Sequence, residues 1–534
     1  MLDLVVKNGR VVDGTGNPWF RGDVSITDGR IVEIGNLGAK ESERIIDAKR
    51  CVVAPGFIDM HSHSDFSPLI NPRMESKVRQ GVTTEVVGNC GVSAAPLNDF
   101  LKEEIMKTTP ILEEAGLKLD WSTMNEYLCR LDSKKTAVNV ASLVGHGNVR
   151  AMVMRYDVRP PTKNELDEMR GVLARALEEG AFGLSSGLIY PPGCYANTAE
   201  LIELCKIVAK YDRLYSSHIR GEEERLIDSV KEAIEIGEKA GVPVEISHHK
   251  AAGKASWGRV KRTLTMIETA RERGIEITCD VYPYLAGSFG LDAMLPPHAY
   301  EGGVEKLVER LKDEEIRQRL RREMMEGIEG WSSPLNAGGW DATMIAYCEG
   351  HPEFEGKMIL EITQLQDIDP FEFVFNLLIE EKASVAVVRF LMREEDMRTV
   401  LKHRVSMIGS DSSARASYGV LGKGKPHPRS YGTFPRVLGT YVRDEGVLTL
   451  EKAIRKMTSL PAQKLKLRDR GLVREGMWAD ITIFDPKMIK DIATYSEPHQ
   501  YPKGIKFVLV NGKVVIDNGE QSGELPGRAL RRRD

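Results

Sequence analysis

The chain has 534 residues, with 74 Lys and Arg against 78 Asp and Glu, which gives a formal net charge of −4. This balance argues against a polyanionic partner, and no basic stripe with interleaved aromatic residues indicates nucleic-acid binding. The length is too great for one small domain and suits a barrel-sized domain with an accessory one.

No apolar run is long enough to cross a bilayer, and the first residues, LDLVVKNG, read as a strand rather than a signal peptide. We therefore expect a cytoplasmic protein with no membrane partner. Seven scattered cysteines, an odd number, do not form a disulfide framework. The sequence carries no signal of an oligomeric state.

Residues 1–50 read as short strands separated by the Asx-Gly pairs that favour hairpin turns, at Asn8-Gly9, Asp13-Gly14 and Asp28-Gly29. The same texture returns at 479–485 and 505–519, with a turn at Asn511-Gly512. Neither segment can bury a face alone, so we expect the two to pair in one small sheet. The predicted organisation is a β domain of residues 1–50 plus 467–534 and a second domain of residues 51–466.

The middle of the chain alternates apolar strand-like runs with charged helical ones, which is typical of parallel strands joined by helices. Helices are predicted over 165–180 and 224–241, each followed or ended by glycine. Eight strands suggest an α/β fold, a (β/α)8 TIM-like barrel. The strands are expected near 52–58, 82–88, 139–145, 181–185, 214–218, 243–248, 275–281 and 405–411.

Residues 290–400 are too many for one barrel connection and include a charged helical stretch, VEKLVERLKDEEIRQRLRREMMEG. A further strand-like run, ASVAVVRF, occupies 383–390. We interpret about 290–400 as an insertion that covers the mouth of the barrel.

Potential metal ligands follow several of these strands, where the loops of such barrels converge on one rim. Alternation along an extended chain places His61 and His63 on the same side, where both imidazoles can bind one ion. The other strand ends carry Cys90, His146, His218, His248, Asp280, Tyr282 and Asp411.

Each of these residues also has a structural interpretation. Cys90, in GNCG, is of a type that often serves as a small buried apolar residue, although the flanking glycines favour an exposed thiol. Asp411 could cap a helix, and His146 could belong to the site or to the framework. His218 and His248 are 30 residues apart, one strand–helix–strand step, which favours ligation by both.

Thiolate and imidazole together select zinc or a similar borderline ion over magnesium or calcium. Zinc lowers the pKa of a bound water from about 15.7 to about 7. Asp411 would bind metal, accept the proton of that water and pass it to a leaving nitrogen. The expected reaction is hydrolysis of an amide-like bond.

The ligand pattern and the split β domain resemble the amidohydrolase superfamily, and within it the N-acyl-D-amino-acid deacylases, or D-aminoacylases. The resemblance covers most of the chain apart from about 290–400. It rests on GVTTEVVGNCGVSAAP (81–96), SSGLIYPPGCYA (185–196), SSHIRGEEE (216–224), EISHHK (245–250), DVYPYLAGS (280–288), HPRSYGTFPRVLGTYVR (427–443) and MTSLPAQKLKLRDRG (457–471).

This resemblance implies a tightly bound zinc on Cys90, His218 and His248, with Cys90 in place of the carboxylated lysine that bridges two metals in many relatives. It implies a weaker second metal site on His61, His63 and Asp411. It also implies that an anionic small-molecule substrate places its carboxylate on Lys250, Tyr282, Ser288 and Arg429. Taken alone, Lys250 and Arg429 could equally be surface charges, and a long glycine-rich stretch separates Arg429 from Asp411.

The expected activity is therefore zinc-dependent hydrolysis of N-acyl-D-amino acids to a carboxylate and a free D-amino acid. Two alternatives remain at this point. One is another amidohydrolase reaction, on cyclic amides or short peptides, of the hydantoinase, dihydropyrimidinase or dipeptidase type. The other is a scaffold that has kept the barrel without its chemistry, which would lack some of these ligands.

Overall fold

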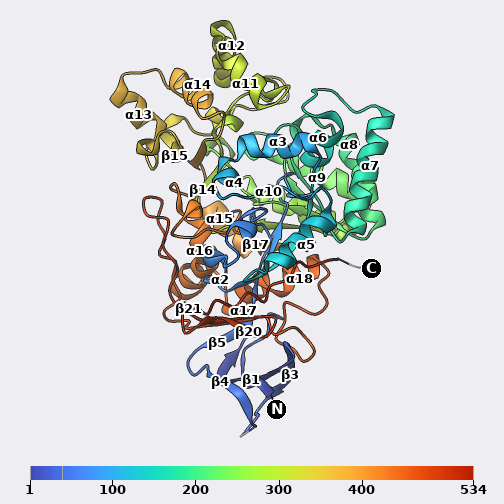
Figure 1. The fold of residues 1–534 in the computed structure, drawn as a ribbon, viewed down its shortest axis with the longest axis vertical. Helices are drawn as coiled ribbons and strands as arrows, with labels where there is room; N and C mark the ends of the chain where they lie inside the picture. The colour runs from blue at the N-terminus through green and yellow to red at the C-terminus, as the bar shows by residue number, and fades with distance from the viewer. Residues whose placement is uncertain (1, 39, 533–534) are drawn as a thin grey trace.

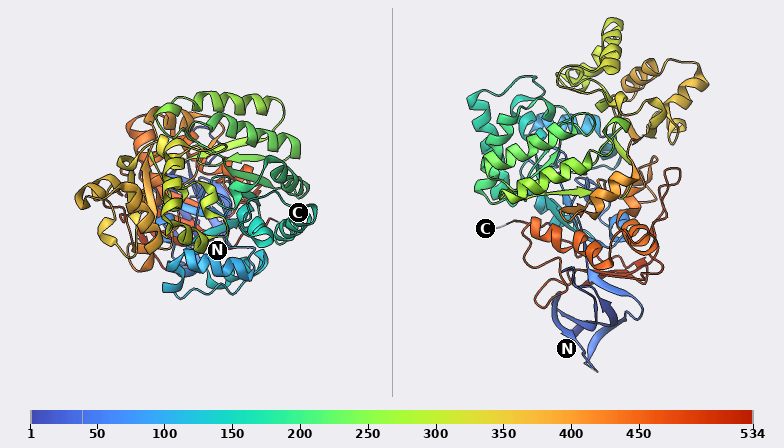
Figure 2. Two further views of the ribbon diagram at one scale, coloured as in Figure 1. Left: turned by 90° about the horizontal axis from the view of Figure 1, so that it is seen from above. Right: turned by 180° about the vertical axis from the view of Figure 1, so that it is seen from behind.

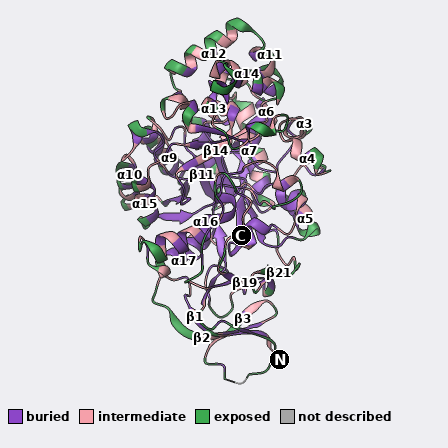
Figure 3. Ribbon diagram, turned by 90° about the vertical axis from the view of Figure 1, so that its left-hand side faces the viewer, coloured by how far each residue is buried: buried purple, intermediate pink, exposed green. Residues whose placement is uncertain are grey.

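The computed structural model describes residues 2–38 and 40–532. Three parts follow one another along the long axis of the molecule: a sheet built from strands near both ends of the sequence, a central barrel, and an inserted segment at the far end (Figure 1). Buried residues are concentrated in the barrel strands, and exposed residues lie on the outer faces of the surrounding helices (Figure 3). Among the described residues, no helix has the length and apolar character needed to cross a membrane.

Parallel strands form a closed barrel, as predicted. The strands pair in two runs. One run has the order β6–β7–β8, and the other has the order β9–β10–β11–β12–β13–β17. Two backbone hydrogen bonds close the seams, from Met60 N–H to Ile408 O at 3.4 Å and from Phe182 N–H to Ser142 O at 2.8 Å. The strands are β6 (Phe57–Asp59), β7 (Val82–Val87), β8 (Asn139–Ser142) with its continuation β9 (Val144–Gly145), β10 (Gly183–Gly187), β11 (Leu214–His218), β12 (Val244–Ile246), β13 (Ile277–Val281) and β17 (Ser406–Ile408).

Helices surround this barrel (Figure 2). Both predicted helices occur, one of them with a capping box of Thr162 and Glu165 at its start. The other ends where Gly241 adopts a φ of 67°, a left-handed conformation that glycine accepts without strain. The helices on the barrel include α6 (His146–Met154), α7 (Lys163–Glu178), α8 (Thr198–Lys210), α9 (Leu226–Ala240), α10 (Val260–Glu272) and α15 (Glu394–Lys402).

The first predicted strand, 52–58, is wrong as a single unit. It divides at Gly56 into β5 (Val52–Pro55), which belongs to the terminal sheet, and β6, which begins the barrel. A Cβ atom at Gly56 would lie 2.2 Å from the Thr83 Oγ1 atom, so only glycine allows this close approach. The accessory sheet therefore continues directly into the barrel.

The terminal sheet joins both ends of the chain, and β5 lies between its two halves. β5 pairs with β1 on one side and with β18 on the other. The predicted turn at Asn8-Gly9 is wrong, because these residues form an irregularity inside β1, where a Cβ atom on Gly9 would lie 2.4 Å from Val53. The strands are β1 (Leu2–Val11), β2 (Phe20–Thr27), β3 (Arg30–Gly35), β4 (Ser42–Asp47), β18 (Ile481–Phe484), β19 (Ile505–Val510), β20 (Lys513–Asp517) and β21 (Glu520–Gln521).

The inserted segment lies between β13 and α15 and has its own antiparallel sheet, in the order β14–β16–β15. The strand-like run at 383–390 contributes β16 to this sheet and not to the barrel. α15 packs on α10 of the barrel, so the segment ends before residue 394. Its elements are β14 (Ala286–Gly290), β15 (Thr343–Tyr347), β16 (Ala386–Phe390), α11 (Val304–Leu311), α12 (Glu314–Glu326), α13 (Ile359–Gln366) and α14 (Pro370–Glu380).

Candidate metal centre

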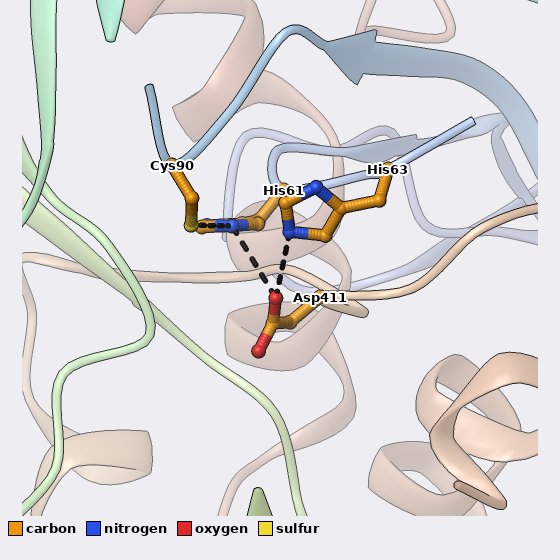
Figure 4. A group of neighbouring side chains, drawn as sticks. All are labelled: His61, His63, Cys90 and Asp411. Carbon is orange, nitrogen blue, oxygen red and sulfur yellow. Dashed lines mark hydrogen bonds and ion pairs between the residues drawn. The ribbon is translucent and has the colours of Figure 1, made fainter. Parts of the chain in front are cut away.

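The six predicted metal ligands meet at the rim of the barrel where the strands end. They form two groups, and within each group the ligand atoms all lie within 4.8 Å of one another. Cys90 belongs to both groups. The first contains His61, His63, Cys90 and Asp411 (Figure 4), and the second contains Cys90, His218 and His248.

The Cys90 thiol is the centre of this arrangement. Its Sγ atom lies 3.3 Å from His61 Nε2 and 3.5 Å from His248 Nε2. His248 Nε2 lies in turn 2.9 Å from His218 Nδ1. On the other side, Asp411 Oδ1 lies 3.0 Å from His63 Nε2 and 3.5 Å from His61 Nε2. One sulfur, one carboxylate and four imidazoles thus surround a small buried volume.

Three of these ligands have an unusual backbone conformation. Cys90, His248 and Asp411 have φ values of 52°, 33° and 52°, in the left-handed region that non-glycine residues rarely adopt. Such strain clusters at sites where the surrounding structure holds a side chain in a required direction. In the Cys90 loop, Ser185 supplies part of this support, because its hydroxyl accepts the Gly91 N–H at 3.0 Å.

The charges of the centre suit a cation. Burial alone would raise the pKa of Cys90, but the neighbouring His61 and His248 lower it well below the usual thiol value. Burial would likewise raise the pKa of Asp411, and the Arg429 guanidinium lowers it. A thiolate, a carboxylate and imidazoles form a donor set that fits zinc.

Two acidic residues hold the histidines from behind. Asp280 Oδ2 lies 3.2 Å from His61 Nδ1, and Glu222 Oε1 lies 2.9 Å from His248 Nδ1. Carboxylates in this position orient a ligating imidazole and raise its basicity. The sequence placed Asp280 at the rim without a role, and Glu222 was missed, since nothing in the run Glu222–Glu224 marks which side chain turns inward.

The four residues predicted to bind a carboxylate lie beside the centre. Two cations lie near the ring of Tyr282, with Lys250 Nζ 5.7 Å and Arg429 Cζ 4.7 Å from its centroid. Burial raises the pKa of Tyr282 to about 12, and its hydroxyl is buried without a hydrogen-bond partner among the described residues. Ser288 contacts Arg429 through its backbone carbonyl, which accepts from Nη2 at 3.3 Å.

A cavity of about 360 Å³ opens onto the predicted metal ligands and is lined by Lys250, Tyr282 and Ser288. An adjoining cavity of about 180 Å³ is lined by Ser288, Arg429 and Asp411. The size of the larger cavity suits a small molecule rather than a polymer.

His146 lies apart from these cavities. Its Nε2 atom is 2.9 Å from Glu200, which also binds the buried Arg150, so His146 belongs to a network behind the rim. Of the two interpretations of His146, the geometry supports the framework one.

The chain matches the amidohydrolase family over residues 44–516. The chain belongs to the amidohydrolase family. The chain is accordingly a metal-dependent hydrolase.

Similar amidohydrolases match along nearly the whole chain. An N-acyl-D-glutamate deacylase of Alcaligenes xylosoxydans xylosoxydans is 37% identical over 99% of this chain and 97% of its own length. A D-aminoacylase of the same organism is 35% identical over 99% and 98%. Among solved structures, the N-acyl-D-glutamate deacylase of Bordetella bronchiseptica, in complex with zinc and a phosphonate inhibitor that mimics the tetrahedral intermediate, is 36% identical, with a TM-score of 0.84 over 99% of this chain and 100% of that one.

Proposed function

We propose that the protein is a zinc-dependent deacylase that hydrolyses N-acyl-D-amino acids to a carboxylate and a free D-amino acid. The observation that carries this proposal is that Cys90 belongs to both ligand groups, one of which also contains Asp411. The cations Lys250 and Arg429 lie beside these groups. Relatives that match over the whole chain at 35–37% identity are deacylases of this kind.

Cys90, His218 and His248 would hold the tightly bound zinc, and His61, His63 and Asp411 would form a second, weaker site. When bound, zinc polarises the acyl carbonyl and makes water acidic enough to act as a nucleophile near neutral pH. The residues behind the ligands, Asp280 and Glu222, keep the imidazoles in the orientation that binding requires.

Asp411 would carry the proton. Its carboxylate faces the space between the imidazoles, and the Arg429 guanidinium lowers its pKa, so the group is ionised, the form that can accept a proton from the attacking water. Delivery of that proton to the leaving nitrogen completes hydrolysis. The protonated nitrogen leaves as a neutral amine, which is a far better leaving group than a nitrogen anion.

The substrate's carboxylate would bind at Lys250, Tyr282, Ser288 and Arg429. Two cations and a free phenol donor around one small space suit a single carboxylate. Binding there orients the acyl amide toward the ligands and makes a free carboxylate a requirement for good substrates.

Neither alternative is favoured by a specific observation. The related enzymes that act on cyclic amides commonly bridge their metals with a strand lysine, a position occupied here by Cys90. A scaffold without chemistry would be expected to lack ligands, whereas the donor set is complete.

The decisive experiment is a chiral panel of N-acetyl amino acids, assayed with and without added zinc, alongside dihydropyrimidines. We expect hydrolysis of D enantiomers that is lost on chelation and restored by zinc. Preference for L enantiomers or for the cyclic amides would contradict the proposal. Failure to take up zinc, with less than one ion per chain after soaking, would favour the scaffold.

A further inference from the structure

Arg389 is a buried cation in the wall of the 360 Å³ cavity. It lies on β16 of the inserted segment, is only 1% exposed, and lines the cavity that opens onto the metal ligands. The residues proposed for catalysis and carboxylate binding do not include it. Its charge therefore has no use in the reaction as described.

The guanidinium of Arg389 is held in place by neutral acceptors. Nε donates to Thr343 Oγ1 at 3.2 Å, and Nη2 donates to the backbone carbonyls of Pro334, at 2.9 Å, and of Gly338. Nη1 makes no hydrogen bond to any described residue, and no carboxylate of the described chain lies within 4.0 Å of the group. Burial lowers the pKa of Arg389 to about 10, so it remains charged at neutral pH. A buried charge without a counter-ion is costly unless a ligand supplies one.

Several other charged groups of the same wall already have ion-pair partners. Glu222 pairs with Lys250, and Arg220 pairs with Glu232. The charge of Glu223 acts on Arg389, but the two side chains form no ion pair, and burial and the adjacent Glu222 raise the pKa of Glu223. Arg389 is thus a fully buried cation of this wall without an ion-pair partner among the described residues, whereas Arg225, which donates to the Gly330 carbonyl, is more exposed.

The position of Arg389 places it next to the proposed carboxylate site. In the β14–β16 pair it lies opposite Gly287, the residue before Ser288. Opposite residues in an antiparallel pair project from the same face. Gly287 has no side chain, and a Cβ atom there would contact only the Tyr282 hydroxyl, at 3.6 Å. The face that carries Arg389 therefore adjoins the hydroxyl of Tyr282.

We propose that Arg389 receives the side-chain carboxylate of the substrate, so that the preferred substrates are N-acyl derivatives of acidic D-amino acids. This inference rests on the proposed deacylase function. Two carboxylates joined by a short chain would occupy two adjacent cationic positions, the first between Lys250 and Arg429 and the second at Arg389. The inserted segment would then set substrate preference, because β16 supplies the selecting residue.

The test compares N-acetyl-D-glutamate and N-acetyl-D-aspartate with their neutral amides, N-acetyl-D-glutamine and N-acetyl-D-asparagine, and with N-acetyl-D-leucine and N-acetyl-D-lysine. For the wild-type enzyme we expect kcat/KM for the better acidic substrate to exceed that for its amide about 10- to 100-fold, the usual effect of a buried charge-assisted contact. Equal or better turnover of the amide, leucine or lysine derivative overturns the inference while leaving the deacylase proposal intact. No turnover of any D substrate refutes the deacylase proposal itself.

Variants assign the preference to the residue. Arg389→Met should remove the acid-over-amide preference while activity on the leucine derivative persists, and Arg389→Lys should keep part of it. Arg225→Met is a matched control, because Arg225 lines the same cavity at a more exposed position, and it should leave the preference unchanged. An equal loss on all substrates in a folded Arg389→Met protein would contradict a selecting role. If the Arg389→Met protein fails to fold, the comparison of acidic and amide substrates with the wild-type enzyme still shows whether acidic substrates are preferred.

Discussion

The Arg429 guanidinium lies 2.8 Å from the Asp411 carboxylate, measured from Nη1 to Oδ2, with both side chains almost fully buried. The residue proposed to hold the substrate's carboxylate therefore also contacts the proposed proton carrier. One guanidinium has donors on several sides, so it can contact both carboxylates at once. Substrate binding and proton transfer are in this way linked through a single side chain.

Replacing Arg429 with Met should lower kcat/KM for N-acyl-D-amino acids about 10- to 100-fold, because a charged contact to the substrate is lost. The diagnostic comparison uses a substrate whose α-carboxylate is blocked as an amide. The wild-type enzyme should strongly prefer the free acid, and the variant should lose that preference. An unchanged preference would show that Arg429 does not bind this group.

Asp411→Asn keeps the size of the side chain but cannot carry a proton. We expect kcat to fall about 10²- to 10⁴-fold, the usual contribution of a positioned acid–base group. Zinc content should be measured on the same preparation, since the site of Cys90, His218 and His248 does not require Asp411. Near-normal turnover with zinc bound would contradict the proton-carrier role.

Glu222→Gln should weaken zinc binding about 10- to 100-fold, because the charge that orients His248 is removed. Competition with a chromogenic chelator measures this directly, without reference to catalysis. Glu223→Gln is the neighbouring control, since Glu223 forms no hydrogen bond to any of the predicted ligands among the described residues. Equal zinc affinity in wild type and the Glu222 variant would show that the contact has no supporting role.

Lys77 joins the two loops that carry His61 and Asp411. Its fully buried ammonium lies 2.8 Å from Asp59, just before His61, and 2.8 Å from the Ser410 hydroxyl, just before Asp411. It also forms an ion pair with Glu85 at 2.9 Å. A single cation thus balances two buried carboxylates beneath the metal centre.

Lys77→Met should therefore destabilise the fold by about 3–5 kcal/mol, because Asp59 and Glu85 would stay buried without a counter-ion. Denaturant unfolding measures the change. The triple variant that adds Asp59→Asn and Glu85→Gln should regain part of the lost stability. A loss below about 1 kcal/mol for the single variant would mean that water replaces the ammonium.

Asp292, in the inserted segment, gives a pH-dependent prediction. Burial raises its pKa from 3.8 to about 6, so the folded state binds this proton more tightly than the unfolded state. Its stabilising contribution is complete below pH 3.8 and is lost as the pH rises through about 6. Asp292→Asn should thus raise the thermal unfolding temperature at pH 7.5 but not at pH 3.5. An equal shift at both pH values would exclude titration as the cause.

The barrel and its ligands were predictable because both depend on local patterns. Apolar runs of strand length alternate with amphipathic helices, and parallel strands bring their following residues to one rim. His61, His63, His218 and His248 therefore meet although no local signal links the first pair to the second. Cys90 required the same argument, together with the glycines that shape its loop.

Other features depend on contacts that the sequence does not encode locally. Residues 52–59 are uniformly buried, so no change of polarity marks the boundary between β5 and β6; only the close approach of Gly56 to Thr83 reveals it. β16 has the composition of a barrel strand, and its partner β14 decides its sheet. Arg389 therefore could not be placed in the cavity wall before the structure was known.

The position of β5 between β1 and β18 has a consequence for biosynthesis. During translation, one edge of β5 remains open until residues 481–484 have left the ribosome. An apolar strand with an open edge can pair with other nascent chains. The order of synthesis thus exposes a template for aggregation through most of elongation, and recombinant yield should benefit from slow translation or added chaperones.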